Sequence, residues 1–106
     1  MLRLVGTIAV LLKNANPKRT KFRVTMQPTS IDAGNTGRVH LGFGFQPTAT
    51  VGHASQGFIL IAATILEEPV GERVIEAYFK QSVWAIASAA DQSVIVEEYT
   101  EEAPKP

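Results

Sequence analysis

Residues 81–99, QSVWAIASAADQSVIVEEY, constrain the fold more strongly than any other part of the chain. Two runs of alternating side chains flank the small polar segment 88–92, a pattern that predicts two strands joined by a short turn in a hairpin. The side chains expected to share one face of each strand are Val83, Ala85, Ala87, Val94 and Val96. Trp84, Ile86 and Ile95 fall on the opposite faces, so we expect the hairpin to lie between the core and a second apolar surface.

Segments 21–27 and 38–46 alternate with the period of half-buried strands. The side chains expected on their apolar faces are Phe22, Val24, Met26, Val39, Leu41, Phe43 and Phe45. Gly42 and Gly44 share the other face of the second segment with His40, which we interpret as a surface histidine. Strand glycines either let another backbone, ring or subunit approach closely, or mark a bulge or bend, and the sequence leaves both open.

The remaining apolar segments also predict strands. Segments 3–12 and 58–66 are apolar on both faces, which indicates cover on both sides or, for the first, pairing at a subunit contact. Segment 73–80 fits a short helix or a strand, and we predict a strand because its neighbours are strands. About six to seven strands separated by turns predict an all-β, single-domain antiparallel β-sandwich, Ig-like or jelly-roll-like, over residues 1–99. Residues 100–106 are expected to form a flexible acidic, proline-rich tail.

Length and charge narrow the possible classes of protein. The 106 residues suffice for one domain, and the lack of cysteine excludes disulfides, thiolate metal sites and cysteine nucleophiles. Residues 1–50 carry seven Lys and Arg against one acid, whereas residues 51–106 carry nine acids against three Lys and Arg. Either basic and acidic strands pair within one sheet, or a basic face of one copy meets an acidic face of another. The short basic cluster has no interleaved aromatic residue beyond Phe22, which argues against a nucleic-acid partner.

The first twelve residues resemble a short signal peptide, but no small-residue cleavage site follows them. The apolar run 4–12 is also too short to span a bilayer, which takes about 20 residues in a helix. We therefore expect no signal peptide and no membrane partner.

The sequence offers no candidate catalytic, cofactor-binding or metal-binding residue. His40 and His53 lack cysteines or acids at ligand spacing, which makes a metal site a poor explanation. Residues 42–44 read G-x-G without the third glycine and the helix that a dinucleotide site needs. The adjacent glutamates at 67–68 and 97–98 would point to opposite faces of a strand, so they form no catalytic dyad. We expect no cofactor and no enzymatic activity.

Some aromatic and apolar residues cannot all be buried in one core. Tyr78 and Phe79 are consecutive, and Trp84 lies opposite the small apolar face of its strand, so a large ring should remain on an outer surface. Exposed apolar patches commonly mark protein contacts. The residues expected at an oligomer or coat-protein contact are Tyr78, Phe79, Trp84, Leu4, Ile8 and Val10.

Four stretches, in order, carry a resemblance to a known family. They are N-P-x-R leading into the alternating strand at 16–26, V-H-L-G-F-G at 39–44, G-F-I-L at 57–60, and V-W-A-I-A-S-A-A-D-Q-S-V-I-V-E-E at 83–98. Together they resemble a recurrent small β domain of tailed-phage virion proteins, found in head decoration proteins and head-fibre bases. The resemblance spans most of residues 16–99. The long apolar segment 3–12 and the extended segment 65–79 depart from the family pattern, and they bear on oligomeric arrangement rather than on fold.

The resemblance implies a non-enzymatic capsid decoration (cement) protein or head-fibre-base protein that binds assembled coat protein and stabilises the shell. Its partners would be the major capsid protein or other virion proteins. The protein would be made in the host cytoplasm, lie on the capsid surface and form a homo-oligomer, with a trimer favoured over a dimer. A glycan- or receptor-binding β-sandwich module is the alternative, which would need a row of exposed aromatic residues.

Overall fold

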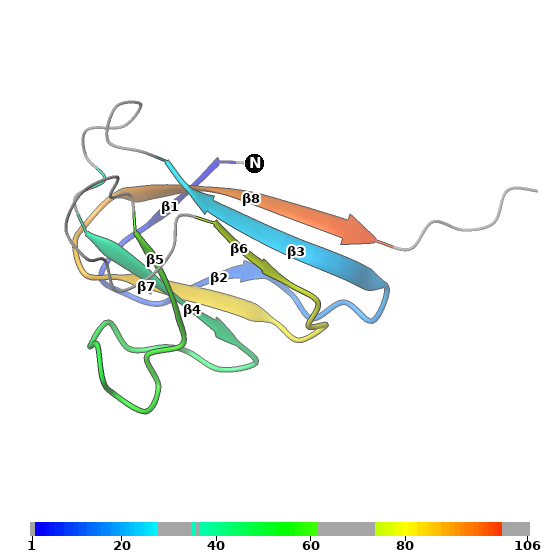
Figure 1. Ribbon diagram of the computed structural model, residues 1–106, viewed down its shortest axis with the longest axis horizontal. Coiled ribbons are helices and arrows are strands. Elements are labelled where there is room, and N and C mark those ends of the chain that lie inside the picture. Colours follow the sequence, from blue (N-terminus) through cyan, green and yellow to red (C-terminus); the bar gives the residue numbers. More distant parts are fainter. Residues whose placement is uncertain (1, 28–34, 36, 62–73, 101–106) are drawn as a thin grey trace, which may run out of the picture.

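The computed structural model describes residues 2–27, 35, 37–61 and 74–100, which form eight strands and no helix (Figure 1). The strands are β1 (Leu2–Val5), β2 (Val10–Lys13), β3 (Arg19–Met26), β4 (Arg38–Phe43), β5 (Phe58–Ile61), β6 (Val74–Ala77), β7 (Val83–Ala87) and β8 (Gln92–Thr100). Sheet A has the order β1-β8-β3-β6, and sheet B has the order β2-β7-β4-β5. All pairs are antiparallel, and the two sheets pack face to face, which confirms the predicted all-β sandwich.

The predicted hairpin at 81–99 is wrong, because its two strands belong to different sheets. β7 pairs with β2 and β4 in sheet B, whereas β8 pairs with β1 and β3 in sheet A. Residues 88–91 therefore carry the chain from one layer of the sandwich to the other, with Asp91 at φ 53°. The prediction of the faces is confirmed, since Val83, Ala85 and Val94 are fully buried. Their side chains meet across the core instead of side by side in one sheet.

The predicted strand 3–12 is also two strands. β1 lies at the edge of sheet A, the chain bends at residues 6–9, and β2 lies at the edge of sheet B. The Ala87 N–H donates to the Gly6 carbonyl at 2.8 Å, which fixes the crossing point against β7. The change of sheet explains why segment 3–12 is apolar on both faces. The core-facing side chains are at odd-numbered positions in β1 and at even-numbered positions in β2.

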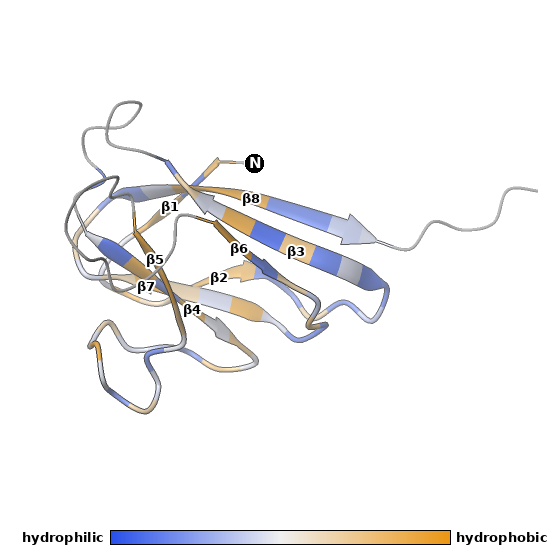
Figure 2. Cartoon of the chain, viewed as in Figure 1, coloured by the Kyte–Doolittle hydropathy of each residue, from blue (hydrophilic) through white to orange (hydrophobic). Residues whose placement is uncertain are grey.

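The core lies between the inner faces of the two sheets. Hydropathy alternates along β3, where Phe22, Val24 and Met26 are fully buried as predicted (Figure 2). The rings of Phe22 and Phe43 meet edge to face across the core at 6.2 Å between centroids. Phe45 is the exception among the predicted inward residues. β4 ends at Phe43, Gly44 takes a positive φ of 86°, and Phe45 is exposed.

The outer face of β4 is covered by the protein's own loop 44–57, so the prediction of a surface histidine is wrong. His40 is fully buried on this face, and its Nδ1 lies 2.8 Å from the Gln56 carbonyl oxygen. A Cβ built on Gly42 would collide with the Phe45 carbonyl oxygen, so this glycine allows close approach of the loop backbone. Of the two explanations for the strand glycines, close backbone approach is the one that applies to Gly42.

The uneven charge is explained by pairing inside sheet A. The basic strand β3 lies between the acid-bearing strands β8 and β6. Arg23 contacts Glu76 at 3.0 Å and Glu97 at 3.5 Å on the outer face. The strand predicted at 73–80 is confirmed for β6, and residues 62–66 of the predicted strand 58–66 lie outside the described residues. β8 runs to Thr100, the first residue of the predicted tail, and residues 101–106 also lie outside.

Candidate interaction surfaces

The six residues predicted at a protein contact do not form one surface. Leu4 on β1 lies opposite Ser93, near the start of β8, whereas Ala77, just before Tyr78, lies opposite Phe22 near the start of β3. Because β1 and β6 are the two edges of sheet A and these positions are at opposite ends of the strands, the two groups occupy opposite corners.

The other predicted contact residues lie elsewhere. Ile8 is exposed in the bend between β1 and β2. Val10 packs against the core from β2 and is partly buried, so its side chain is turned toward the interior. Trp84 is partly buried on the outer face of sheet B, opposite Leu11 on β2 and Gly42 on β4. That Trp84 contacts a partner stays a prediction.

Three phenylalanine rings meet at the corner of the sandwich where β4 ends and β5 begins. The Phe43 centroid lies 5.6 Å from Phe58 and 5.1 Å from Phe79, and the last two are 6.4 Å apart. Phe43 is buried, whereas Phe58 and Phe79 are 47% and 45% exposed. We call Phe43, Phe58 and Phe79 the aromatic corner. Tyr78, next to Phe79 in the chain, is 68% exposed and makes no ring contact with these three phenylalanines.

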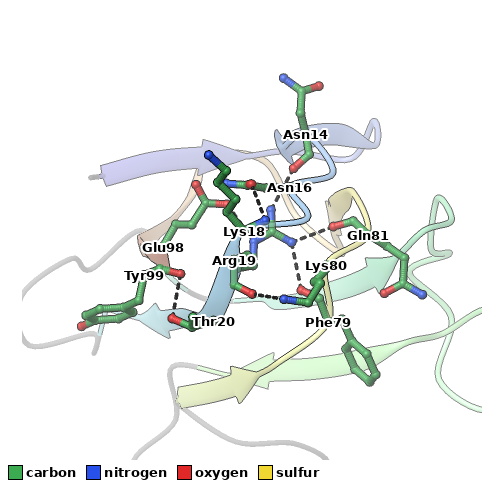
Figure 3. Close-up of polar contacts among 10 residues, drawn as sticks. All are labelled: Asn14, Asn16, Lys18, Arg19, Thr20, Phe79, Lys80, Gln81, Glu98 and Tyr99. Atoms are coloured by element: carbon green, nitrogen blue, oxygen red, sulfur yellow. Dashed lines mark hydrogen bonds and ion pairs between the residues drawn. The ribbon is translucent and has the colours of Figure 1, made fainter. Parts of the chain in front are cut away.

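A buried arginine holds the segment that carries Phe79. Arg19 is fully buried, and its Nη1 donates to the carbonyl oxygens of Phe79 at 3.1 Å and Gln81 at 2.7 Å (Figure 3). Its Nη2 donates to the Asn14 carbonyl at 2.8 Å, and its Nε donates to Glu98 at 2.7 Å. The guanidinium therefore ties the β2–β3 turn, the β6–β7 segment and β8 together.

Further contacts complete this attachment. The Lys80 Nζ donates to the Arg19 carbonyl at 2.8 Å (Figure 3). The Asn16 N–H donates to the Lys80 carbonyl at 2.8 Å. The Arg19 guanidinium also lies over the Phe22 ring at 5.3 Å from its centroid. Sequence reasoning placed Arg19 only within a basic cluster and missed this role, because its carbonyl acceptors leave no mark in the sequence. The residues 79–81 are thus fixed by main-chain contacts, and the exposed Phe79 ring is held in place.

A second exposed apolar surface follows β1. Leu2 and Leu4 point to the outer face of sheet A and are 55% and 60% exposed. Arg3 has the opposite parity, and its guanidinium donates to the carbonyl oxygens of Leu11 at 3.2 Å and Leu12 at 3.4 Å. The outer surface of β1 is therefore free of charge. We call Leu2 and Leu4 the β1 leucines.

His40 is the one histidine whose surroundings are unusual. Burial is the main cause that lowers its pKa from 6.5, the Arg38 charge adds to this effect, and the bond to the Gln56 carbonyl opposes it. Since Nδ1 faces a carbonyl oxygen, it carries the proton, and Nε2 is then a buried acceptor that finds no hydrogen-bond partner among the residues that the structure describes. Across the described part of the chain, no group of three or more His, Cys, Asp or Glu could hold a metal ion.

Comparisons with known proteins add no assignment to these surfaces. No protein family, no curated protein and no solved structure matches this chain. Among the described residues there is also no helix that is long and apolar enough to cross a membrane. The assignment to virion proteins therefore stays a prediction from the resemblance.

Proposed function

We propose that this chain is a non-enzymatic structural protein of a tailed-phage virion, a capsid decoration (cement) or head-fibre-base protein. It binds the major capsid protein, or another virion protein, through the aromatic corner and lies on the capsid surface. The observation that carries the binding role is the exposure of Phe58 and Phe79 over the buried ring of Phe43. The virion setting rests on the resemblance of residues 16–99.

The physical case for a protein contact is preorganisation. Aromatic residues dominate the energetics of protein interfaces, where they fill pockets on the partner. Binding costs less when such a side chain is already held in its bound position, because less conformational entropy is lost. Phe79 meets this condition, since Arg19 and Lys80 anchor the backbone around it and two other rings pack against its own.

The rim of this corner suits a protein partner as well. Lys80 and Gln81 follow Phe79 and bring polar groups next to the rings, which matches the polar rim around the apolar centre of ordinary interfaces. Stabilising a shell by surface contact requires no catalytic group, and this is consistent with a protein that acts through shape and apolar area alone.

The test is co-sedimentation of the purified protein with coat-protein shells of the phage whose genome carries the gene. We expect the wild type to sediment with the shells and both Phe58→Ala and Phe79→Ala to reduce the bound fraction at least tenfold at limiting concentration. Tyr99→Ala is the matched control, because Tyr99 is an exposed aromatic residue on another face, where it lies over Lys21. Circular dichroism and thermal unfolding establish that each variant remains folded.

Two results would overturn the proposal in different ways. If the wild-type protein does not bind the shells at all, the virion function is wrong. If it binds and both phenylalanine variants bind equally well, the function stands and the aromatic corner is the wrong surface. A glycan array with wild-type protein covers the alternative function, and a specific hit that Phe79→Ala abolishes would favour a glycan-binding module instead.

A further inference from the structure

The four edge strands of the sandwich differ in how they are protected. At β2, the carbonyl oxygens of Leu11 and Leu12 accept hydrogen bonds from Arg3. At β6, the outward residue Glu76 places a charge beside the edge. β5 carries no charge and no proline, but the residues that follow it, 62–73, lie outside the described part of the chain, so the cover of its edge is not assigned. β1 carries no charge on its outer face and no proline, and its one charged residue, Arg3, points inward and is held by the β2 carbonyl oxygens, so the outer side of this edge lacks the charges and prolines that usually prevent edge pairing.

The exposed side of β1 also has the right chemistry for pairing. Every other residue of a strand points its N–H and C=O away from the neighbouring strand, so β1 presents backbone groups at the outer edge of sheet A that no other described strand pairs. The β1 leucines add apolar surface to these backbone groups. Across the sheet, Leu2 continues into a row with Ile95 on β8, which lies opposite Thr25 on β3.

We propose that two copies of this chain associate by antiparallel pairing of their β1 strands about a twofold axis, which joins the two A sheets into one continuous sheet. The partner is a second copy because the outer edge of β1 is complementary to the same edge of an identical strand. In a twofold contact the same surface must be complementary to its own copy, and the residue at the axis of an antiparallel pair lies directly opposite its own equivalent. This inference does not depend on the coat-protein partner proposed above.

The charges select the register. The outer faces of both copies must lie on the same side of the joined sheet. The twofold axis must therefore pass between the two copies of one β1 residue, which then lie opposite each other. The two residues near the middle of β1 are Arg3 and Leu4, and either could lie at the axis. An axis at Arg3 would set two arginines directly opposite each other, which is unfavourable. An axis at Leu4 pairs Leu4 with its copy and sets Arg3 opposite Val5 of the second chain. We therefore assign the axis to Leu4.

The other charges of sheet A do not oppose this contact. The outer-face charges nearest in the sheet are Glu97, Arg23 and Glu76, which lie in one row across β8, β3 and β6. That row crosses β8 beyond Ile95, the residue opposite Leu2, so it lies past the end of β1. A threefold assembly would instead need two different complementary surfaces on each copy, and β1 supplies one surface that is complementary to itself. The expected species is a dimer, in contrast to the trimer that the resemblance favours.

The contact is small, so the dimer should be weak. A standard interface buries about 800 Å² per partner, and a four-residue strand with two exposed leucines buries less. Sedimentation velocity should therefore cover protein concentrations from about 10 μM to about 1 mM, the range in which weak complexes form. We expect a monomer–dimer equilibrium that Leu4→Lys shifts at least tenfold toward monomer, because it places two charges at the axis.

Val51→Lys is the matched control, because Val51 is a similarly exposed apolar residue in loop 44–57. We expect this variant to dimerise like the wild type. A wild-type protein that stays monomeric over the whole range, a trimer, or a dimer that Leu4→Lys leaves unchanged would each overturn the proposal. The shell co-sedimentation above is read out separately, so either proposal can fail while the other stands.

Disulfide trapping tests the register directly, because the chain contains no cysteine. Residues directly opposite in an antiparallel pair have Cα atoms about 4.5–5.5 Å apart, within the range that a disulfide bridges. We expect Leu4→Cys to form covalent dimers under mild oxidation faster than Leu2→Cys or Val51→Cys. Equal rates for Leu4→Cys and Val51→Cys would refute pairing through β1, and fast trapping only when Leu2→Cys and Leu4→Cys are mixed would move the axis to Arg3.

Discussion

Replacing Arg19 with methionine removes the guanidinium and keeps an unbranched apolar stem of similar length. The loss leaves the carbonyl oxygens of Asn14, Phe79 and Gln81 without this donor, and it leaves the largely buried Glu98 carboxylate without its cation. Removing one partner of a buried pair costs about 3–5 kcal/mol of stability. The unpaired carbonyl groups could raise this cost, but they are only partly buried and water can reach them, so we expect a total of about 3–5 kcal/mol.

Urea unfolding followed by Trp84 fluorescence measures this change. A domain of this size loses about 1.5 kcal/mol of stability per molar urea, so the unfolding midpoint should fall by about 2–3 M. Arg23→Met is the control, because it removes the same charge from a cation whose partners Glu76 and Glu97 lie on the exposed face of sheet A. Its midpoint should change far less, since solvent screens exposed pairs. Equal midpoints for the two variants would refute the structural role of Arg19.

Three further outcomes follow from the packing. Burial lowers the pKa of His40 from 6.5, so below that pH the unfolded chain binds a proton that the folded chain does not. The stabilising contribution of the neutral His40 is therefore complete above pH 6.5, and stability falls below it by up to about 1.4 kcal/mol per pH unit. His40→Gln should remove this slope from a plot of urea midpoints against pH. Gly42→Ala should cost about 1–3 kcal/mol because its Cβ meets a loop carbonyl, whereas Gly6→Ala, where the Cβ enters open space, should change the thermal midpoint little. Phe22→Ala should cost about 3–5 kcal/mol in urea unfolding followed by circular dichroism, and Trp84→Ala, which lacks the only tryptophan, should cost less in that assay because Trp84 is only partly buried; the reverse order would contradict the placement of the core.

The parity of side chains along the strands was predictable, but the partners of the strands were not. Alternation correctly assigned Phe22, Val24 and Met26 to the core, because the period of a strand is a local property. The same alternation is compatible with a hairpin and with a crossing between sheets, so it gave the wrong connection for residues 88–91. The long apolar segment 3–12 concealed a change of sheet for the same reason, since apolar residues on both faces fit either arrangement.

The candidate surfaces were also predictable from the sequence only in part. The adjacency of Tyr78 and Phe79 predicted that one of the two rings stays on an outer surface, because two consecutive residues of a strand cannot both face one core. Both rings are exposed, because β6 ends at Ala77, before either residue. The grouping of Phe79 with Phe58 depends on which strands meet at the corner, and that is a property of topology. The burial of His40 depends on a loop that folds back over β4, and no local pattern in residues 44–57 indicates this.

The strand order also sets the sequence of events in folding. In the described part of the chain, β4 and β5 are the only hydrogen-bonded neighbours that follow one another directly in the sequence. Every other pair joins distant segments, and such topologies fold slowly, on the order of milliseconds to seconds. Among the described strands, β1 pairs with β8 and β2 pairs with β7, so both must wait until residues 83–100 have been synthesised before they can pair. Until then, the β1 leucines are exposed on an unpaired segment, and this interval is when the nascent chain is most open to aggregation.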